Sequence, residues 1–307
     1  MGHRAVWRKA KWRRDGGSRA GFDNDRTSPP PTRQRSQSRG INRVVPQSKS
    51  GQFAVLIRSI VFNALFYLNL IVQMVAVIPT MVMPRGAIVA VVKFWARTNL
   101  WLLRKICGIV VEFRGLEGIP PGALIVASKH QSMWETFALF PLFADPAFIL
   151  KRELMWIPFF GWFSWKAGMI PVNRGKRSQA LMELGISARE ELARGRQIVI
   201  FPEGTRRAPR AEPSYKFGVT HLYTETGAVC LPIALNSGLF WPRRSFRRFP
   251  GTIIVEVLDP IAPGLSKEDF AARLQHSIET ATARLIVEGE RELARNGVKQ
   301  ASLAPSS

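Results

Sequence analysis

A histidine and a carboxylate stand close together after an apolar run, in Ser128-Lys129-His130-Gln131-Ser132-Met133-Trp134-Glu135. Five residues of a helix turn through about 500°, so His130 and Glu135 cannot share a helical face. They meet only if His130 lies in the turn before a helix and Glu135 lies in its first turn. A carboxylate that holds one imidazole nitrogen leaves the other free to take a proton, as in a general base. Ser132-x-x-Glu135 is also a helix capping box, and the spacing leaves both interpretations open.

A second candidate is the turn Phe201-Pro202-Glu203-Gly204-Thr205-Arg206, which also follows an apolar run. Pro202 ends a β-ladder, and Gly204 allows a tight backbone turn. Thr205 and Arg206 then bring a hydroxyl and a guanidinium to one point. A phosphate accepts paired bonds from Arg together with backbone N–H groups. An ordinary β-turn with a solvated arginine has the same composition.

Two further apolar runs also end in polar side chains. Asn173 and Arg174 follow Met169-Ile170-Pro171-Val172, and Lys151 follows Ala147-Phe148-Ile149-Leu150. Arg174 repeats the pattern of a strand that delivers a guanidinium at its end. Lys151 is a weaker electrostatic candidate in the same kind of position. Two strand-end arginines favour an anion-binding site over two unrelated surface residues.

These residues need a scaffold that brings strand ends together. After Gly115, short apolar runs alternate with longer amphipathic ones, which is typical of an α/β sandwich. The continuous apolar character of the runs predicts strands that are covered on both faces. The predicted strands are 123–127, 147–150, 169–172, 197–201, 229–234 and 252–257, and the predicted helices are 132–143, 178–193, 215–226 and 266–294. Ser266-x-x-Asp269 predicts the start of the last helix.

Residues 52–108 have the composition of a membrane element. No charged residue occurs in 59–84, and a helix of about 20 such residues matches the roughly 30 Å hydrocarbon core of a bilayer. Proline and glycine within 79–86 break that helix, and the second apolar run contains Lys93 and Arg97. Charges at mid-depth each cost a few kcal/mol, so a helical hairpin that enters one leaflet and returns is favoured over two full spans. A single anchor followed by a core helix is the alternative.

An aromatic run within 156–165 has three possible roles, namely contact with the bilayer interface, the lining of an apolar channel, or core packing. Its members are Trp156, Phe159, Phe160, Trp162, Phe163 and Trp165.

The composition limits the class of protein. The chain has 307 residues, 46% of them hydrophobic, and a formal net charge of +22 at pH 7. Residues 1–51 mix many Arg residues with Ser, Pro, Gln and Gly and are predicted to be a disordered basic tail, as 299–307 are a disordered end. Cys107 and Cys230 are far apart, which excludes a disulfide scaffold and a thiolate zinc cluster. No metal and no resident cofactor are expected.

Four blocks occur in a defined order: His130-x4-acid, Val172-Asn173-Arg174, Phe201-Pro202-Glu203-Gly204-Thr205-Arg206 and Val229-Cys230-Leu231-Pro232-Ile233-Ala234. Together they resemble the blocks of the glycerolipid acyltransferases, most closely the bacterial 1-acyl-sn-glycerol-3-phosphate acyltransferases. The family's usual acid is Asp, whereas this chain has Glu135, which is one methylene longer. The resemblance implies an α/β domain over 109–298 with a mixed, largely parallel sheet flanked by helices, preceded by the hydrophobic helical hairpin.

The resemblance also implies a reaction. A fatty acyl group would pass from an acyl thioester, either acyl-CoA or acyl-carrier protein, to the sn-2 hydroxyl of 1-acyl-sn-glycerol-3-phosphate, giving phosphatidic acid. His130 would be the general base and Glu135 its orienting carboxylate, and the hydroxyl would attack directly, without an acyl-enzyme. The residues expected to bind the acceptor phosphate are Arg174, Glu203, Gly204, Thr205 and Arg206, with Asn173 and Lys151 as weaker candidates. Within this set, Glu203 would organise the turn through the arginines.

The expected partners are the lipid substrate, an anionic membrane surface and the soluble thioester donor. The basic tail favours the cytoplasmic side, so the catalytic domain is expected on the cytoplasmic face of the inner membrane. Another lysolipid acceptor, such as a lyso-ornithine lipid, is the alternative within the enzyme class. The alternative outside the enzyme class is a membrane-tethered nucleic-acid-binding protein, whose function would lie in residues 1–50. If the protein is an enzyme, no nucleic acid is expected as a partner.

Overall fold

The computed structural model describes residues 43–46, 49–173 and 177–301. All of them belong to one compact unit within residues 40–307. Most of the tail expected over 1–51, the final residues 302–307 and the candidate Arg174 lie outside the described residues.

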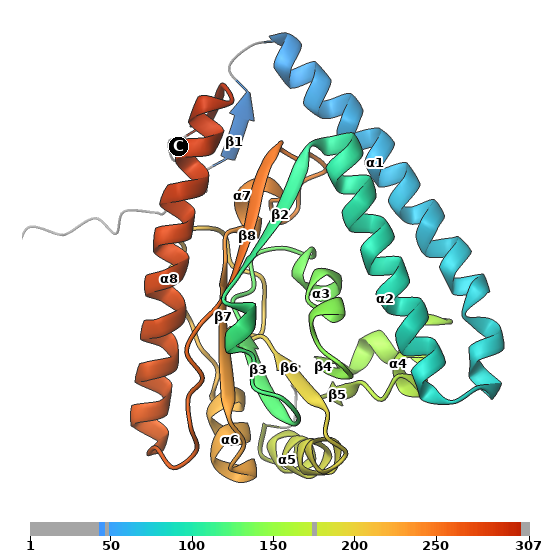
Figure 1. Cartoon of the computed structure of the whole chain (residues 1–307), viewed down its shortest axis with the longest axis vertical. Helices are drawn as coiled ribbons and strands as arrows, with labels where there is room; N and C mark the ends of the chain where they lie inside the picture. The colour runs from blue at the N-terminus through green and yellow to red at the C-terminus, as the bar shows by residue number, and fades with distance from the viewer. Residues whose placement is uncertain (1–42, 47–48, 174–176, 302–307) are drawn as a thin grey trace, which may run out of the picture. The chain divides into compact units, whose positions relative to one another are not determined.

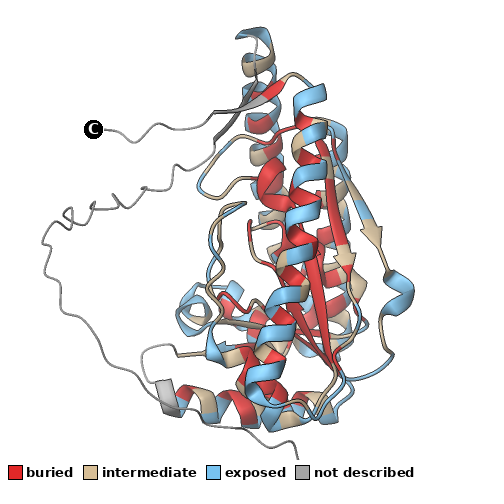
Figure 2. Ribbon diagram, turned by 90° about the vertical axis from the view of Figure 1, so that its left-hand side faces the viewer, coloured by how far each residue is buried: buried red, intermediate tan, exposed pale blue. Residues whose placement is uncertain are grey.

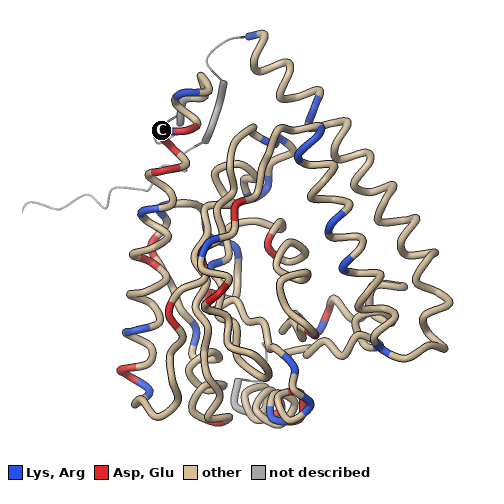
Figure 3. The backbone as a smooth tube through the Cα atoms, in the orientation of Figure 1, with Lys and Arg blue, Asp and Glu red and all other residues tan. Residues whose placement is uncertain are grey.

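The first part of the described chain is a helical hairpin (Figure 1). Helix α1 (Lys49–Ala76) is followed by the short 3₁₀ helix η1 (Ile78–Val82), helix α2 (Arg85–Leu102) and the π-helical turn η2 (Leu103–Cys107). Proline at the start of η1 and Pro84 before α2 mark the reversal that the sequence predicted. Both helices are long and apolar enough to cross a membrane by length and composition. Figure 3 shows α1 without Lys, Arg, Asp or Glu along most of its length.

Polar contacts join the hairpin to the connection between strands β7 (Cys230–Leu235) and β8 (Gly251–Val257). The backbone N–H of Arg248 donates to Ser59 Oγ (2.8 Å), and its Nη2 donates to Asn63 Oδ1 (3.1 Å). The Arg248 guanidinium also lies 4.0 Å from the ring centroid of Trp241. Burial lowers the pKa of Arg248 to about 10. A buried arginine therefore ties α1 to the loop that follows β7.

The domain is built on a seven-stranded sheet with the order β2-β8-β7-β3-β6-β4-β5. All neighbouring pairs are parallel except β7 and β8, so the sheet is mixed and largely parallel, as predicted. Strands β3, β4, β5, β6 and β7 share one direction, and their carboxyl ends meet at one edge. The remaining strand bounds are Ile109–Arg114 for β2, Leu124–Ser128 for β3, Pro146–Lys151 for β4, Ile170–Val172 for β5 and Gln197–Ile200 for β6.

Helices cover both faces of this sheet, and Figure 2 shows the central strands buried between them. Alternate strand residues such as Val126 and Val199 pack on the side of the hairpin, α3 (Glu135–Ala138) and α7 (Ser237–Phe240). Their neighbours Ile125 and Ile198 pack against α5 (Arg177–Ala193), α6 (Phe217–Thr226) and the first half of α8 (Lys267–Arg295). The remaining elements are η3 (Leu116–Gly118), η4 (Phe140–Leu142), η5 (Arg152–Trp156) and α4 (Phe160–Lys166).

Several elements differ from the predicted bounds. The helix expected over 132–143 is a short α3 followed by η4, because Pro141 lacks the N–H that would continue an α-helix. Strand β2 and helix α4 were not predicted. A second, two-stranded sheet pairs β1 (Arg43–Pro46) with β9 (Val298–Ala301), which lie within or at the border of segments expected to lack structure. The last helix starts as predicted, with Ser266 Oγ accepting from Asp269 N (3.0 Å).

Candidate active site

His130 lies in the turn between β3 and α3, at the carboxyl edge of the sheet. Its Nδ1 lies 3.0 Å from Glu135 Oε1, the first residue of α3. The imidazole ring stacks on the ring of Phe201, with centroids 4.0 Å apart and planes inclined by 17°. The side chain of His130 is 13% exposed, and no described residue forms a hydrogen bond with its Nε2. The ring is thus fixed on one nitrogen and one face, while the other nitrogen can meet a substrate.

Glu135 contacts both the imidazole of His130 and the backbone of the turn before α3. Its Oε1 accepts the backbone N–H groups of Gln131 (2.6 Å) and Ser132 (2.7 Å), as a carboxylate does at the start of a helix. The same oxygen faces His130, and Oε2 accepts from Ser237 Oγ (2.9 Å). The side chain is fully buried. The longer side chain therefore reaches the imidazole from the first residue of the helix.

The turn after β6 lies directly beside His130. The backbone N–H of Arg207 donates to the carbonyl of His130 (2.8 Å). Gly204 has φ +63°, a conformation that favours glycine. Its N–H donates to Phe201 O (2.8 Å). This backbone N–H therefore stabilises the turn and is not available to a substrate. Thr205 is exposed and Arg206 is half-buried, which leaves both side chains accessible.

Glu203 is placed differently from the prediction. Its buried carboxylate pairs with Lys129 Nζ (3.1 Å), and Lys129 also pairs with Glu279 (2.7 Å). The prediction that Glu203 organises the turn through the arginines is thus wrong. Its ion-pair partner is Lys129, the residue before His130. Burial raises the pKa of Glu203, and the Lys129 ammonium opposes this rise. Glu203 therefore anchors the turn from the interior and does not present its charge to a phosphate.

A cluster of arginines surrounds the turn, and part of it was missed from the sequence. Arg243 Nη1, from the loop after α7, donates to the backbone carbonyl of Arg206 (2.7 Å). Burial lowers the pKa of Arg243, and so do the nearby charges of Arg244, Arg206 and Arg207. We refer to these four residues as the arginine cluster. In the described part of the chain, no ion pair with Asp or Glu neutralises any of them. The only sequence signal was the pair Arg243-Arg244 after the fourth block.

The remaining candidates lie at the same sheet edge. Strands β4 and β5 are paired in parallel, with Lys151 opposite Val172. Lys151 is the last residue of β4 and Asn173 is the residue after β5, so the two lie at neighbouring strand ends. The Lys151 side chain is half exposed and pairs with Glu153 (3.1 Å), which supports only a weak role at the site. Asn173 is half-buried. Arg174 lies outside the described residues, so its phosphate-binding role stays a prediction.

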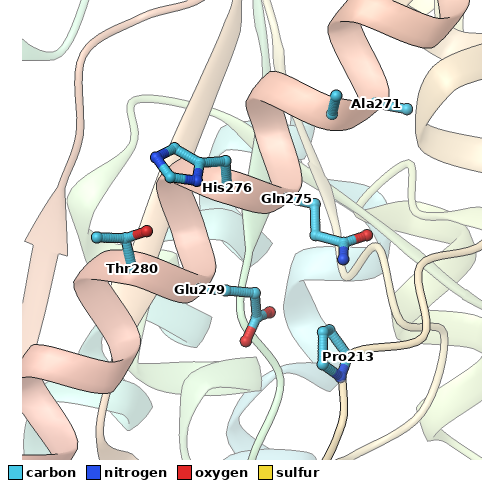
Figure 4. Close-up of a pocket in the computed structure, with 7 residues that line it drawn as sticks. Pro213, Ala271, Gln275, His276, Glu279 and Thr280 are labelled. Carbon is cyan, nitrogen blue, oxygen red and sulfur yellow. The ribbon is translucent and has the colours of Figure 1, made fainter.

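A surface pocket of about 440 Å³ lies elsewhere, on the first half of α8 (Figure 4). Its lining includes His276, Gln275 and Pro213. It also includes Glu279, which pairs with Lys129 beside His130. None of the predicted site residues lines it. Among the described residues, no group of three or more His, Cys, Asp or Glu side chains is arranged to hold a metal ion.

Comparison with known proteins identifies the relatives of this chain. The family model described as Acyltransferase matches residues 110–236. The 1-acyl-sn-glycerol-3-phosphate acyltransferase of Pseudomonas aeruginosa is 41% identical over 167 residues, which cover 54% of this chain and 65% of that protein. The human 1-acyl-sn-glycerol-3-phosphate acyltransferase alpha is 30% identical over 200 residues, covering 63% and 71%. The matching segments thus span about two thirds of these relatives.

A solved structure shares the fold. The 1-acyl-sn-glycerophosphate (LPA) acyltransferase PlsC from Thermotoga maritima superposes with a TM-score of 0.61 and 23% identity, covering 75% of this chain and 97% of that one. Fold and family model together define an α/β domain of the acyltransferase class, preceded by two helices that are long and apolar enough to cross a membrane. The chain belongs to the family of the 1-acyl-sn-glycerol-3-phosphate acyltransferases.

Proposed function

We propose that this chain transfers a fatty acyl group from an acyl thioester to the sn-2 hydroxyl of 1-acyl-sn-glycerol-3-phosphate, forming phosphatidic acid. The observation that carries the proposal is the position of the His130–Glu135 pair directly beside the arginine cluster. A base for a hydroxyl and a site for an anion then lie within one substrate's reach. Family membership supports the same reaction.

His130 acts as the general base in this mechanism. Nε2 takes the proton of the lysolipid hydroxyl while the oxygen attacks the thioester carbonyl. Glu135, on Nδ1, fixes the tautomer and stabilises the imidazolium that forms (3.0 Å). The tetrahedral intermediate then expels the thiolate, which takes the proton back from His130. The products are phosphatidic acid and the free thiol of the donor.

The attack is direct, without an acyl-enzyme. Ser132 Oγ accepts from Trp134 N (2.9 Å), and Ser237 Oγ donates to Glu135 (2.9 Å), so both nearby hydroxyls are engaged in the structure of the site. Cys107 and Cys230 are buried. A thioester is already an activated acyl group, and the lysolipid supplies the nucleophile itself.

The arginine cluster binds the acceptor phosphate. Arg206 and Arg243 come from two different loops that the 2.7 Å bond holds together, and Thr205 adds an exposed hydroxyl. A phosphate monoester carries about −1.5 to −2 charges at pH 7, so unneutralised guanidinium groups suit it. Arg174 is proposed as a further ligand on its sequence position. Lys151 and Asn173 remain weaker candidates at the neighbouring strand ends.

The reaction takes place at the membrane surface. The substrate keeps its acyl chain in the bilayer, and burial of each methylene is worth about 0.8 kcal/mol, so extraction into water is costly. The hairpin holds the site at the lipid, and the cytoplasmic face of the inner membrane gives access to a soluble donor, acyl-CoA or acyl-carrier protein. No resident cofactor takes part in the proposed mechanism.

The test is an assay of membranes that carry the full chain, with a panel of lysolipids and both classes of thioester. We expect acylation of 1-acyl-sn-glycerol-3-phosphate, and a much lower rate with a lyso-ornithine lipid, which lacks the phosphate. His130→Ala should abolish the reaction while the protein stays in the membrane fraction. Equal rates for the two acceptors, or unchanged activity of the variant, would overturn the proposal.

A further inference from the structure

The segment between β4 and β5 exposes an unusual amount of aromatic surface. Trp156, Trp162 and Trp165 have 81%, 60% and 71% of their surface exposed. We call the exposed apolar side chains of η5 and α4 the aromatic surface: Leu154, Trp156, Ile157, Phe159, Phe160, Trp162 and Trp165. The core packing that the sequence left open as one role is therefore wrong for these side chains.

Small residues on the inner side of α4 turn the aromatic rings outward. Gly161, Ser164 and Ala167 are buried, at a spacing of three residues that places them on one helical face. A Cβ on Gly161 would lie 1.8 Å from the carbonyl oxygen of Met155, so no larger residue fits there. The helix packs closely through its backbone, and its large side chains stay on the surface.

The aromatic surface continues into the reversal of the hairpin. Val77 and Ile88 form one buried cluster with Ala167 at the end of α4, and Phe163 packs against it. Figure 1 shows α4 beside the end of α2 that adjoins η1. The reversal itself exposes apolar side chains, with Val82 almost fully accessible. Two segments about 80 residues apart in the chain therefore pack together, and both expose apolar side chains.

Basic residues flank this surface. Lys151 precedes η5, Arg152 is its first residue, and both are exposed, while Lys166 ends α4. Glu153 is the single acidic residue in 151–167. Tryptophan at an apolar edge next to Lys and Arg is typical of contact with the head-group region of an anionic bilayer.

We propose that the aromatic surface enters the same leaflet as the reversal of the hairpin, as a third membrane contact of the chain. Its occupant is a lipid surface, because the surface continues from an apolar hairpin and carries a basic rim. The segment connects the strands that end at Lys151 and Val172, so its insertion turns the carboxyl edge of β4 and β5 toward the lipid. This contact does not depend on the reaction proposed above.

The test uses a fluorophore at defined positions of the full chain in vesicles of phosphatidylethanolamine and phosphatidylglycerol. Because Cys107 and Cys230 are buried, a new surface cysteine can be labelled selectively. Trp162→Cys and Trp165→Cys report on the aromatic surface. Met182→Cys is the matched control, since Met182 is a similarly exposed apolar residue (61%) on α5. Each protein is labelled with an environment-sensitive dye, and its emission is measured with and without brominated acyl chains in the lipid.

We expect brominated lipids to remove most of the emission at both tryptophan positions and to leave the control unchanged. Emission at Trp162 and Trp165 that aqueous iodide quenches and brominated lipid does not would overturn the proposal. Emission that neither agent quenches would also overturn it, because that result would mean that protein, such as a second copy of the chain, covers the surface. Two labelled positions keep the result readable if one variant folds poorly.

Discussion

Replacing Glu135 with Gln removes one negative charge and little else. The amide oxygen can still accept from Gln131 N and Ser132 N, which lie 2.6 Å and 2.7 Å from Oε1, and the amide nitrogen can donate to Ser237 Oγ. The fold of the turn should therefore survive. What is lost is the charge that stabilises the imidazolium of His130 in the transition state.

The magnitude follows from the 3.0 Å contact between His130 and Glu135. A hydrogen bond to a charged group contributes about 1.5–3 kcal/mol, and about 1.36 kcal/mol is a tenfold change in rate. We expect kcat of Glu135→Gln to fall about 10- to 150-fold on this basis, with the KM for the lysolipid little changed. Removal of the base itself, in His130→Ala, should cost about 10²- to 10⁴-fold.

The assay measures phosphatidic acid by mass spectrometry and released thiol by colour, in mixed micelles with the lysolipid and acyl-CoA. Ser237→Ala is the matched control, because it removes one bond to Glu135 and leaves the charge in place. The double variant of His130 and Glu135 should be no slower than His130→Ala alone, since the carboxylate acts only through the imidazole. Independent losses in the double variant, or a Glu135→Gln rate within twofold of wild type, would refute this reasoning.

Three further outcomes are expected. Arg243→Gln should raise the KM for the phosphate-bearing lysolipid about tenfold, the value of a charge-assisted bond, with Arg247→Gln in the same loop as the unchanged control; an unchanged KM for Arg243→Gln would remove it from the site. Arg196→Met should lower the free energy of unfolding by about 3–5 kcal/mol, measured by denaturant titration, because it removes a buried guanidinium that pairs with Glu191 and donates to the backbone carbonyls of Ala167 and Gly168; a loss below about 1 kcal/mol would contradict this. Cys230 should react with a thiol reagent at pH 8 only after unfolding, because burial raises its pKa and the thiolate is absent; rapid reaction of the folded protein would contradict the burial.

The sequence was sufficient for the features that depend on local pattern. The six predicted strands align with β3, β4, β5, β6, β7 and β8, because continuous apolar runs bounded by turn residues specify buried strands. His130 and Glu135 could be paired because the contact spans five residues and needs only a turn followed by a helix start. The carboxyl ends of parallel strands lie at the same edge of a sheet, so the turn after β6 could be predicted to lie near His130.

Contacts between distant segments could not be predicted. Arg243 meets the carbonyl of Arg206 across 37 residues, and Ser237 meets Glu135 across 102. Glu203 was assigned to arginines because they are its neighbours in sequence, whereas the fold supplies Lys129 from an adjacent strand. Strand β2 was missed because its charged and half-exposed residues interrupt the apolar run. Pattern specifies elements, but only the register of the sheet decides which side chains meet.

Arg248 donates hydrogen bonds to Ser59 and Asn63, so the apolar hairpin also supports the loop between β7 and β8. The loop that it braces is the one from which Arg243 reaches the Arg206 carbonyl. A version of the protein that lacks α1 would therefore lose these bonds, and the loop that carries Arg243 would be held less firmly. The hairpin and this loop are in this sense one rigid unit, so a bilayer that held the hairpin would also fix the distance between the lipid and the proposed phosphate site.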